Sequence, residues 1–169
     1  MFIQSLNLVK IELGYEAFHA VILGNDQGRD SYKKKLMQLT EQYHLTNQIK
    51  FIDHCKDMAL AYKISDIVIS PSIEPEAFGR VAVEAQSMEK LIIASNIGGS
   101  NETIIDGKTG LLFEAGDPNS LSKRIIQAVT LDESSYKRMG KEGKNNISKK
   151  FNVEKMCFST YSEYKRLLN

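Results

Sequence analysis

The stretch Ser70–Glu84 reads SPSIEPEAFGRVAVE, and it decides the fold. The apolar run Asp66–Ser70 leads into it and is ended by Pro71, which predicts a short strand. After Gly79, small and apolar residues predict a helix. Open α/β sheets bind ligands at this end of a strand. A helix that begins there offers free N–H groups and partial positive charge, which suits a phosphate.

Strand-like and helical runs alternate on both sides of this unit. Alternation of this kind predicts an α/β, Rossmann-like doubly wound domain, with a mainly parallel sheet and helices on both faces. The strands lack polar alternation, as expected when both faces are buried. The expected strands are Ala17–Leu23, Ile49–Ile52, Asp66–Ser70, Leu91–Ser95 and Thr109–Phe113. The expected helices are Met1–Gly14, Ser31–Tyr43, Met58–Ser65, Arg80–Met88, Asn101–Ile105, Asn119–Leu131, Ser134–Lys149 and Val153–Leu168.

Size and charge exclude several classes of function. A chain of 169 residues suits one domain, and 22 basic against 21 acidic residues leave a net charge of +1, which gives no support for nucleic-acid binding. No apolar run is long enough to span a bilayer and no secretory signal is visible, so we expect a cytoplasmic protein. The three histidines are scattered, so no metal site is predicted.

Three polar loops follow Leu23, Ser70 and Ser95, and a doubly wound fold brings them to one sheet edge. Glycines in each loop allow close backbone approach to a ligand. The first loop contributes Gly24 and Asn25 to the predicted site. Together the loops predict a ligand that contains phosphate and sugar.

The acidic and basic side chains of the central loop admit two interpretations each. Glu84 could accept two ribose hydroxyls, or it could be an acid favoured by the helix dipole. Glu76 could face a ligand, or it could be a solvated loop acid like Glu74. Arg80 could approach a phosphate or lie on the surface. For Phe78 we favour packing under the loop over stacking on a base.

The motifs, taken together, are those of one family. The pattern E-x7-E from Glu76 to Glu84, with Phe78-Gly79-Arg80-Val81 inside it, resembles the donor-binding half of the retaining GT-B glycosyltransferases of group 1 (family 4). Further segments resemble that family's GG-x-x-E loop, D-G-x-T-G-x-L turn, G-D-P helix start, G-D-x-x-G loop and V-x-F-x-G segment. They are Ile97–Ile104, Asp106–Leu112, Gly116–Pro118, Val21–Gly28 and Ile49–Met58.

The resemblance implies a role for each candidate residue. Glu84 would bind the ribose of a nucleoside-diphosphate sugar, and Glu76 would lie beside the donor sugar as the catalytic residue. Backbone N–H groups around Gly79–Val81 would face the diphosphate. The loop Gly98–Gly99 would lie near the sugar, and Ile52, Asp53 and His54 would border the base. The implied reaction is hexosyl transfer with retention, with no evident protein nucleophile and no cofactor.

The chain also departs from the family. Asp53 stands where the family usually has glycine. The family carries a strand and an Arg…Lys pair ahead of the helix that Met1–Gly14 resembles, and neither is present. The missing strand would be central, between Ala17–Leu23 and Asp66–Ser70, so we expect exposed ladder groups and self-association. The acceptor-binding N-terminal domain is absent too, so 1–169 is expected to be a single donor-binding domain with little or no activity alone.

Three hypotheses follow. The chain could be the donor-binding part of a group 1 glycosyltransferase for glycan, envelope polysaccharide or lipopolysaccharide synthesis, working with a separate N-terminal polypeptide. It could be a non-catalytic remnant or nucleotide-sugar-binding module. A sugar-nucleotide 2-epimerase is disfavoured by the E-x7-E pattern. The basic run Lys137–Lys150 is interpreted as an exposed helix face, with a weak contact to the inner membrane surface as the alternative.

Overall fold

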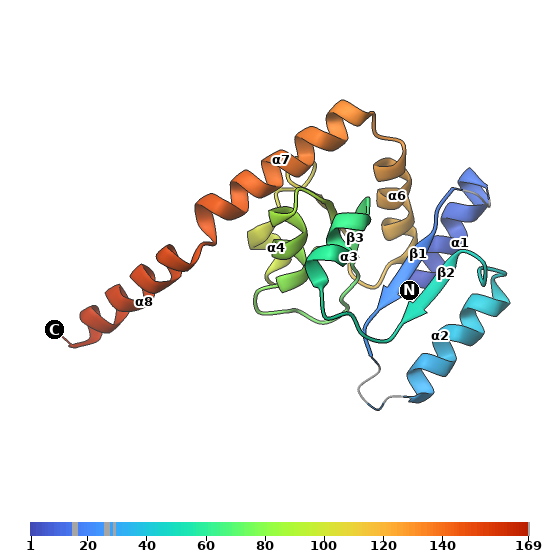
Figure 1. Ribbon diagram of the computed structural model, residues 1–169, viewed down its shortest axis with the longest axis horizontal. Coiled ribbons are helices and arrows are strands. Elements are labelled where there is room, and N and C mark those ends of the chain that lie inside the picture. Colours follow the sequence, from blue (N-terminus) through green and yellow to red (C-terminus); the bar gives the residue numbers. More distant parts are fainter. Residues whose placement is uncertain (15–16, 26–27, 29, 169) are drawn as a thin grey trace.

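The computed structural model describes residues 1–14, 17–25, 28 and 30–168, and the predicted alternation is confirmed (Figure 1). The strands in these residues are β1 (Ala20–Leu23), β2 (Ile49–Ile52), β3 (Ile67–Ser70), β4 (Leu91–Ser95) and β5 (Leu111–Phe113). The helices are α1 (Phe2–Leu13), α2 (Asp30–Gln42), α3 (Met58–Ile64), α4 (Arg80–Ser87), α5 (Ser100–Thr103), α6 (Pro118–Val129), α7 (Glu133–Lys150) and α8 (Val153–Leu168).

All the paired strands are parallel, but they form two sheets rather than one. β1 pairs with β2, and β3, β4 and β5 form a second sheet in that order. The described residues contain no ladder between β1 and β3, the two strands that the family resemblance places on either side of a further strand. β4 is buried at every position, whereas β1 and β3 are largely half-buried and Val21 is 55% exposed. Val21 thus exposes apolar surface on β1, whereas the apolar residues of β3 are half-buried.

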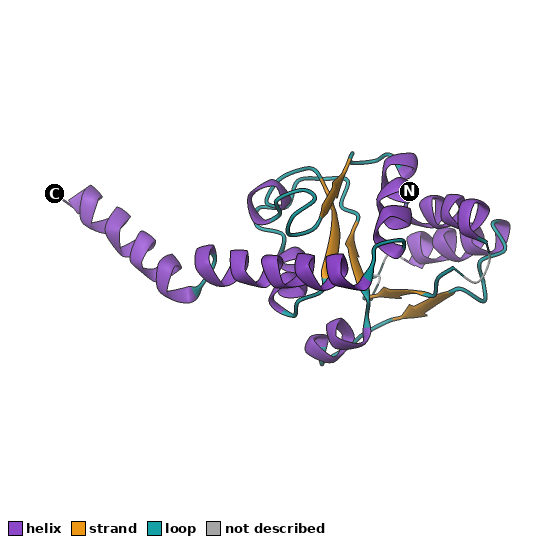
Figure 2. Ribbon diagram, turned by 90° about the horizontal axis from the view of Figure 1, so that it is seen from above, coloured by secondary structure: helices purple, strands orange, loops and turns teal. Residues whose placement is uncertain are grey.

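Helices cover both faces of the three-stranded sheet, as predicted. Leu91 and Ile93 of β4 face the core that includes α1 and α6. The alternate residues, Ile92 and Ala94, face the opposite side, where they pack with residues of α3 and α4. Successive strand residues point to opposite faces, so this division follows from the strand itself. The resulting order of layers is helix, sheet, helix (Figure 2).

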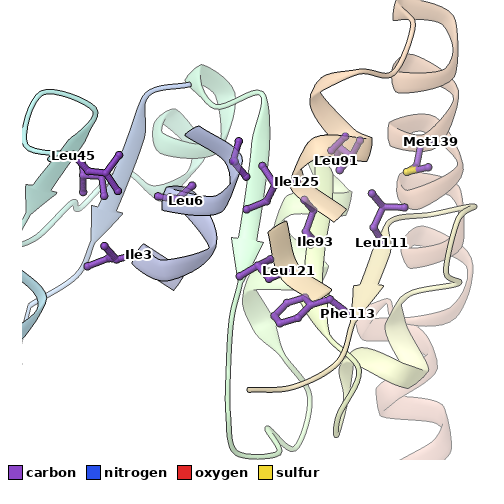
Figure 3. Close-up of a cluster of buried hydrophobic side chains, with 13 residues drawn as sticks. Ile3, Leu6, Leu45, Leu91, Ile93, Leu111, Phe113, Leu121, Ile125 and Met139 are labelled. Atoms are coloured by element: carbon purple, nitrogen blue, oxygen red, sulfur yellow. The ribbon is translucent and has the colours of Figure 1, made fainter. Parts of the chain in front are cut away.

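The largest core cluster also joins the two sheets. α1 packs along α6, so that Leu6 lies in the same cluster as Ile125 and Ile93 (Figure 3). Leu6 and Val9 of α1 are both buried in this cluster. Ile3 is buried there, and Leu13 is 38% exposed.

Turn chemistry explains where elements begin. Asp117 caps α6 by accepting a hydrogen bond from Asn119 N at 2.8 Å, and Pro118 occupies the first turn, in the segment that resembles the family's G-D-P helix start. β5 begins at Leu111 rather than Thr109, because Thr109 Oγ1 accepts from Ile105 N at 2.8 Å and so belongs to the preceding turn. β1 likewise begins at Ala20, three residues later than expected.

α7 packs against α4, and α8 extends away from the rest of the described chain (Figure 1). The lysines and arginines of the basic run Lys137–Lys150 are exposed on α7, as a helix face predicts, and Lys144 pairs with Glu89 at 2.8 Å. α8 has no buried residue. α8 should therefore add little to the stability of the rest of the described chain.

Deleting residues 153–169 should leave the free energy of unfolding within about 0.5 kcal/mol of the full chain, because no buried contact is removed. Leu6→Ala, which opens a cavity in the shared core, should cost about 2–5 kcal/mol. Urea unfolding followed by circular dichroism measures both. A loss of several kcal/mol on deletion would contradict the assignment of α8 as a helix without a packing role in this chain.

Candidate functional site

α4 follows the loop after β3 and begins without a side-chain cap. Gly79 is the N-cap residue and adopts φ 73°, ψ 62°, a left-handed conformation that favours glycine. Its carbonyl accepts hydrogen bonds from Ala82 N at 3.1 Å and Val83 N at 3.4 Å. Helix geometry leaves the N–H groups of Arg80 and Val81 without an intrahelical acceptor, and no described side chain caps them. These groups can therefore receive an anion.

The loop after β4 packs directly against that segment. Gly99 N donates to Glu76 O at 2.8 Å. A Cβ added to Gly98 would lie 2.5 Å from Glu76 O, and one added to Gly99 would lie 2.5 Å from Phe78 C. Both glycines are therefore required because two backbones touch. From the sequence we expected glycines here because a ligand would approach the backbone closely. In the structure, the close approach of the neighbouring loop explains both glycines.

Glu84 lies on α4 beyond its first turn, where it is held by two side chains. Arg80 donates to Oε1 from Nη2 at 2.8 Å and from Nε at 3.2 Å. Tyr62 of α3 donates its hydroxyl to Oε2 at 2.8 Å. The helix-dipole interpretation of Glu84 explains little, because that effect fades after the first turn. The Glu84 side chain is 34% exposed, so the carboxylate remains open to solvent.

Tyr62 is buried at 6% exposure, although it carries a polar hydroxyl. Burial, followed by the hydrogen bond to Glu84 and the charge of that carboxylate, raises the pKa of Tyr62 well above its usual range. The phenol thus stays protonated at neutral pH and remains a donor. This pairing was not predicted, because Tyr62 and Glu84 lie on different helices, 22 residues apart in sequence.

Glu76 has the same charge as Glu84 but differs from it in exposure and in its hydrogen-bond partner. It is exposed, and its carboxylate accepts a hydrogen bond from Ser72 Oγ within the same loop. Ser72 was also missed by sequence reasoning, although a serine four residues before a loop acid is a usable signal. Glu76 is free to contact a ligand, while its backbone is fixed by Gly99.

Two further candidates of this loop have partners of their own. The sequence left two interpretations of Arg80, a phosphate contact and a surface position. In the structure its side chain is 83% exposed and pairs with Glu84. Phe78 is 44% exposed, and its ring contacts that of Phe151 at 5.8 Å between centroids. Phe78 therefore lies at the surface against Phe151, not under the loop as we favoured from the sequence.

The remaining candidates form a second group on the β1–β2 sheet. Gly24 N donates to Ile52 O at 2.9 Å, which joins the ends of the two strands. Asp53 and His54 are exposed just beyond β2, and Asp53 pairs with Lys33 of α2. Asn25 is exposed as well. The loop predicted at Val21–Gly28 is described only in part, since Asp26 and Gln27 lie outside the described residues.

The structure thus joins the loops after β3 and β4 by direct contact and places the loop after β1 on the other sheet. No cluster of three or more metal-binding side chains occurs among the described residues. Within residues 1–14, 17–25, 28 and 30–168, no helix is long and apolar enough to cross a membrane.

Comparison with known proteins identifies the family of the chain. The family model described as "Glycosyl transferases group 1" matches residues 1–146, which is most of the chain. The chain belongs to the group 1 glycosyltransferases. The capsular polysaccharide biosynthesis glycosyltransferase CapM of Staphylococcus aureus is 26% identical, over 98% of this chain and 42% of its own.

Solved glycosyltransferase structures share the fold. A glycosyltransferase from Rickettsia africae superposes with a TM-score of 0.90 at 30% identity, over 99% of this chain and 44% of its own. Anabaena HepE, solved in complex with UDP and glucose, gives 0.84 at 25% identity, over 97% of this chain and 44% of its own. The chain therefore spans less than half the length of each of these three proteins.

Gly99→Ala should destabilise the protein by about 1–3 kcal/mol, because the methyl group would overlap the Phe78 backbone. The native φ of −60° suits alanine, so backbone strain is not the cause. Asn101→Ala, at an exposed position of the same turn, is the matched control and should change stability by less than about 0.5 kcal/mol. Equal unfolding midpoints for the two variants in urea would contradict the close approach of the loops.

Proposed function

We propose that residues 1–169 bind the donor, a nucleoside-diphosphate sugar, for a group 1 glycosyltransferase that transfers a hexose with retention at the anomeric carbon. The observation that carries the proposal is the arrangement on α4. Free N–H groups open the helix at Arg80 and Val81, and an accessible carboxylate follows at Glu84. Four residues of helix separate Arg80 from Glu84 by about 6 Å along the axis, a spacing suited to a diphosphate and its adjoining ribose.

Each part of the donor has a matching group. The diphosphate would accept hydrogen bonds from Arg80 N and Val81 N and gain from the helix dipole. The ribose hydroxyls would donate to Glu84, the sugar would lie by Glu76 and the Gly98–Gly99 loop, and the base would approach the segment Ile52–His54. HepE has the same fold and was solved in complex with UDP and glucose, which supports a nucleotide sugar as the ligand.

The chemistry follows from this placement. An acceptor hydroxyl oxygen bonds to the anomeric carbon as the bond between that carbon and the diphosphate oxygen breaks. The diphosphate leaves with the electron pair, and the acceptor's hydroxyl proton passes to the leaving diphosphate or to solvent. Preorganised N–H groups at the start of α4 stabilise the charge that develops on the leaving group, a common and large catalytic effect. Acceptor residues would come from chain outside residues 1–169, in the same or a separate polypeptide. The similarity to CapM, which is named for capsular polysaccharide biosynthesis, favours a role in polysaccharide synthesis.

Glu84→Ala should weaken binding of the preferred nucleoside diphosphate by at least about tenfold, since hydrogen bonds to a charged group are lost. Titration calorimetry of the chain with UDP-, GDP- and ADP-sugars first identifies that ligand. Glu74→Ala removes the same charge from the neighbouring loop and should leave the affinity unchanged. Equal dissociation constants for wild type and Glu84→Ala would contradict the ribose role of Glu84.

Glu76→Gln should separate sugar recognition from nucleotide recognition. If Glu76 contacts the donor sugar, the variant should bind the free nucleoside diphosphate like the wild type but bind the nucleotide sugar several-fold more weakly, the loss of one charged hydrogen bond. The two affinities are measured on the same preparation by calorimetry. An equal loss for both ligands would place Glu76 at the nucleotide instead.

A further inference from the structure

The three hydrogen bonds on Glu84 differ in how firmly they are held. Both Arg80 bonds end on Oε1, and the Arg80 side chain is 83% exposed. The single bond from Tyr62 ends on Oε2 and comes from a residue of 6% exposure. Exposed ion pairs contribute little to stability, because solvent screens them and competes for both partners. The guanidinium of Arg80 can therefore leave, while the phenol cannot move freely.

Packing fixes where the Tyr62 hydroxyl lies. Tyr62 belongs to the buried cluster that contains Ala82 and Ala85 of α4 and Ile92 and Ala94 of β4. Its ring thus packs on the same helix that carries Glu84, and this packing directs the hydroxyl toward the Glu84 carboxylate. A buried hydroxyl that lost its acceptor would be penalised, so the bond to Glu84 should persist.

The lone pairs of Glu84 limit how a diol can bind. An ionised carboxylate offers about four acceptor sites, two on each oxygen. Arg80 occupies both sites on Oε1, and Tyr62 occupies one on Oε2. Two hydroxyls that approach both oxygens therefore need Arg80 to release at least one bond. Tyr62 leaves one site on Oε2 open and can remain in place.

We propose that Tyr62 is a positioning residue that fixes the plane of the Glu84 carboxylate for the two ribose hydroxyls, and that Arg80 is a displaceable counter-ion of Glu84. The inference rests on the proposed function and adds a residue from α3 to the site. Because α3 follows the segment Ile52–His54, the same bond ties the ribose contact to the strand end where the base is expected.

The test compares ligands that differ at one hydroxyl. Dissociation constants are measured by calorimetry for the preferred nucleoside diphosphate and its 2′-deoxy counterpart, using the 169-residue chain. The wild type should prefer the ribonucleotide by about tenfold, the effect of one hydrogen bond to a charged group. Tyr62→Phe keeps the buried ring and removes only the hydroxyl, and it should reduce this preference to about threefold or less.

Tyr136→Phe is the matched control. It also removes one phenol hydroxyl, which donates to Asp66 O at 2.6 Å at the start of β3, away from the site. This variant should keep the wild-type preference for ribose. Melting temperatures show whether each variant is folded. In a Glu84→Gln background, Tyr62→Phe should cause no further change in the preference, because the carboxylate that it positions is already gone.

The outcomes separate the two proposals. If Tyr62→Phe weakens both ligands equally, or lowers only the melting temperature, Tyr62 is a packing residue and the inference is overturned while donor binding stands. If the wild type discriminates by the 2′-hydroxyl and Tyr62→Phe does so equally, the inference is overturned as well. If the wild type binds no nucleoside diphosphate, the proposed function fails and this inference fails with it.

Discussion

The site depends on a backbone-to-backbone contact between the two loops at the carboxyl ends of β3 and β4. Gly99 N donates to Glu76 O, and neither Gly98 nor Gly99 has room for a side chain. This contact holds the start of α4 where its N–H groups face outward. A sequence without the glycine pair would separate the loops, and the acidic side chains on them would lose their common frame.

Around that contact, two carboxylates of equal charge acquire different properties. Glu84 is half-buried on a helix, with donors on both oxygens. Glu76 is exposed in a loop and held by Ser72. A fixed, partly neutralised carboxylate suits recognition of hydroxyl groups, whereas an exposed one can contact a group that changes during a reaction. Their environments, more than their spacing of eight residues, support separate roles.

Sequence predicted most of the fold, because the apolar strands and the turn residues between them are local signals. The Asp117 cap and the boundaries of β2, β3 and β4 followed from adjacent residues. The start of β1 did not, since it depends on tertiary packing. The division into two sheets could be anticipated at the edge between β1 and β3 because the family resemblance marks a strand there.

The site was predicted less completely than the fold. Glu76, Gly79 and Glu84 stand in one short stretch, so their association could be inferred from spacing. Tyr62 could not, because its partner lies on another helix and no motif joins them. The pairing of Arg80 with Glu84 is compatible with an i, i+4 spacing, yet the sequence offered equally good surface and phosphate positions for that side chain.

The central claim is that α4 and its neighbours receive a nucleotide sugar in a defined orientation. The most direct measurement is a crystal structure of the chain with its preferred nucleoside diphosphate. We predict the diphosphate at Arg80 N and Val81 N, both ribose hydroxyls on Glu84, and Tyr62 still donating to Oε2. A nucleotide bound elsewhere, or one whose ribose makes no contact with Glu84, would contradict the account.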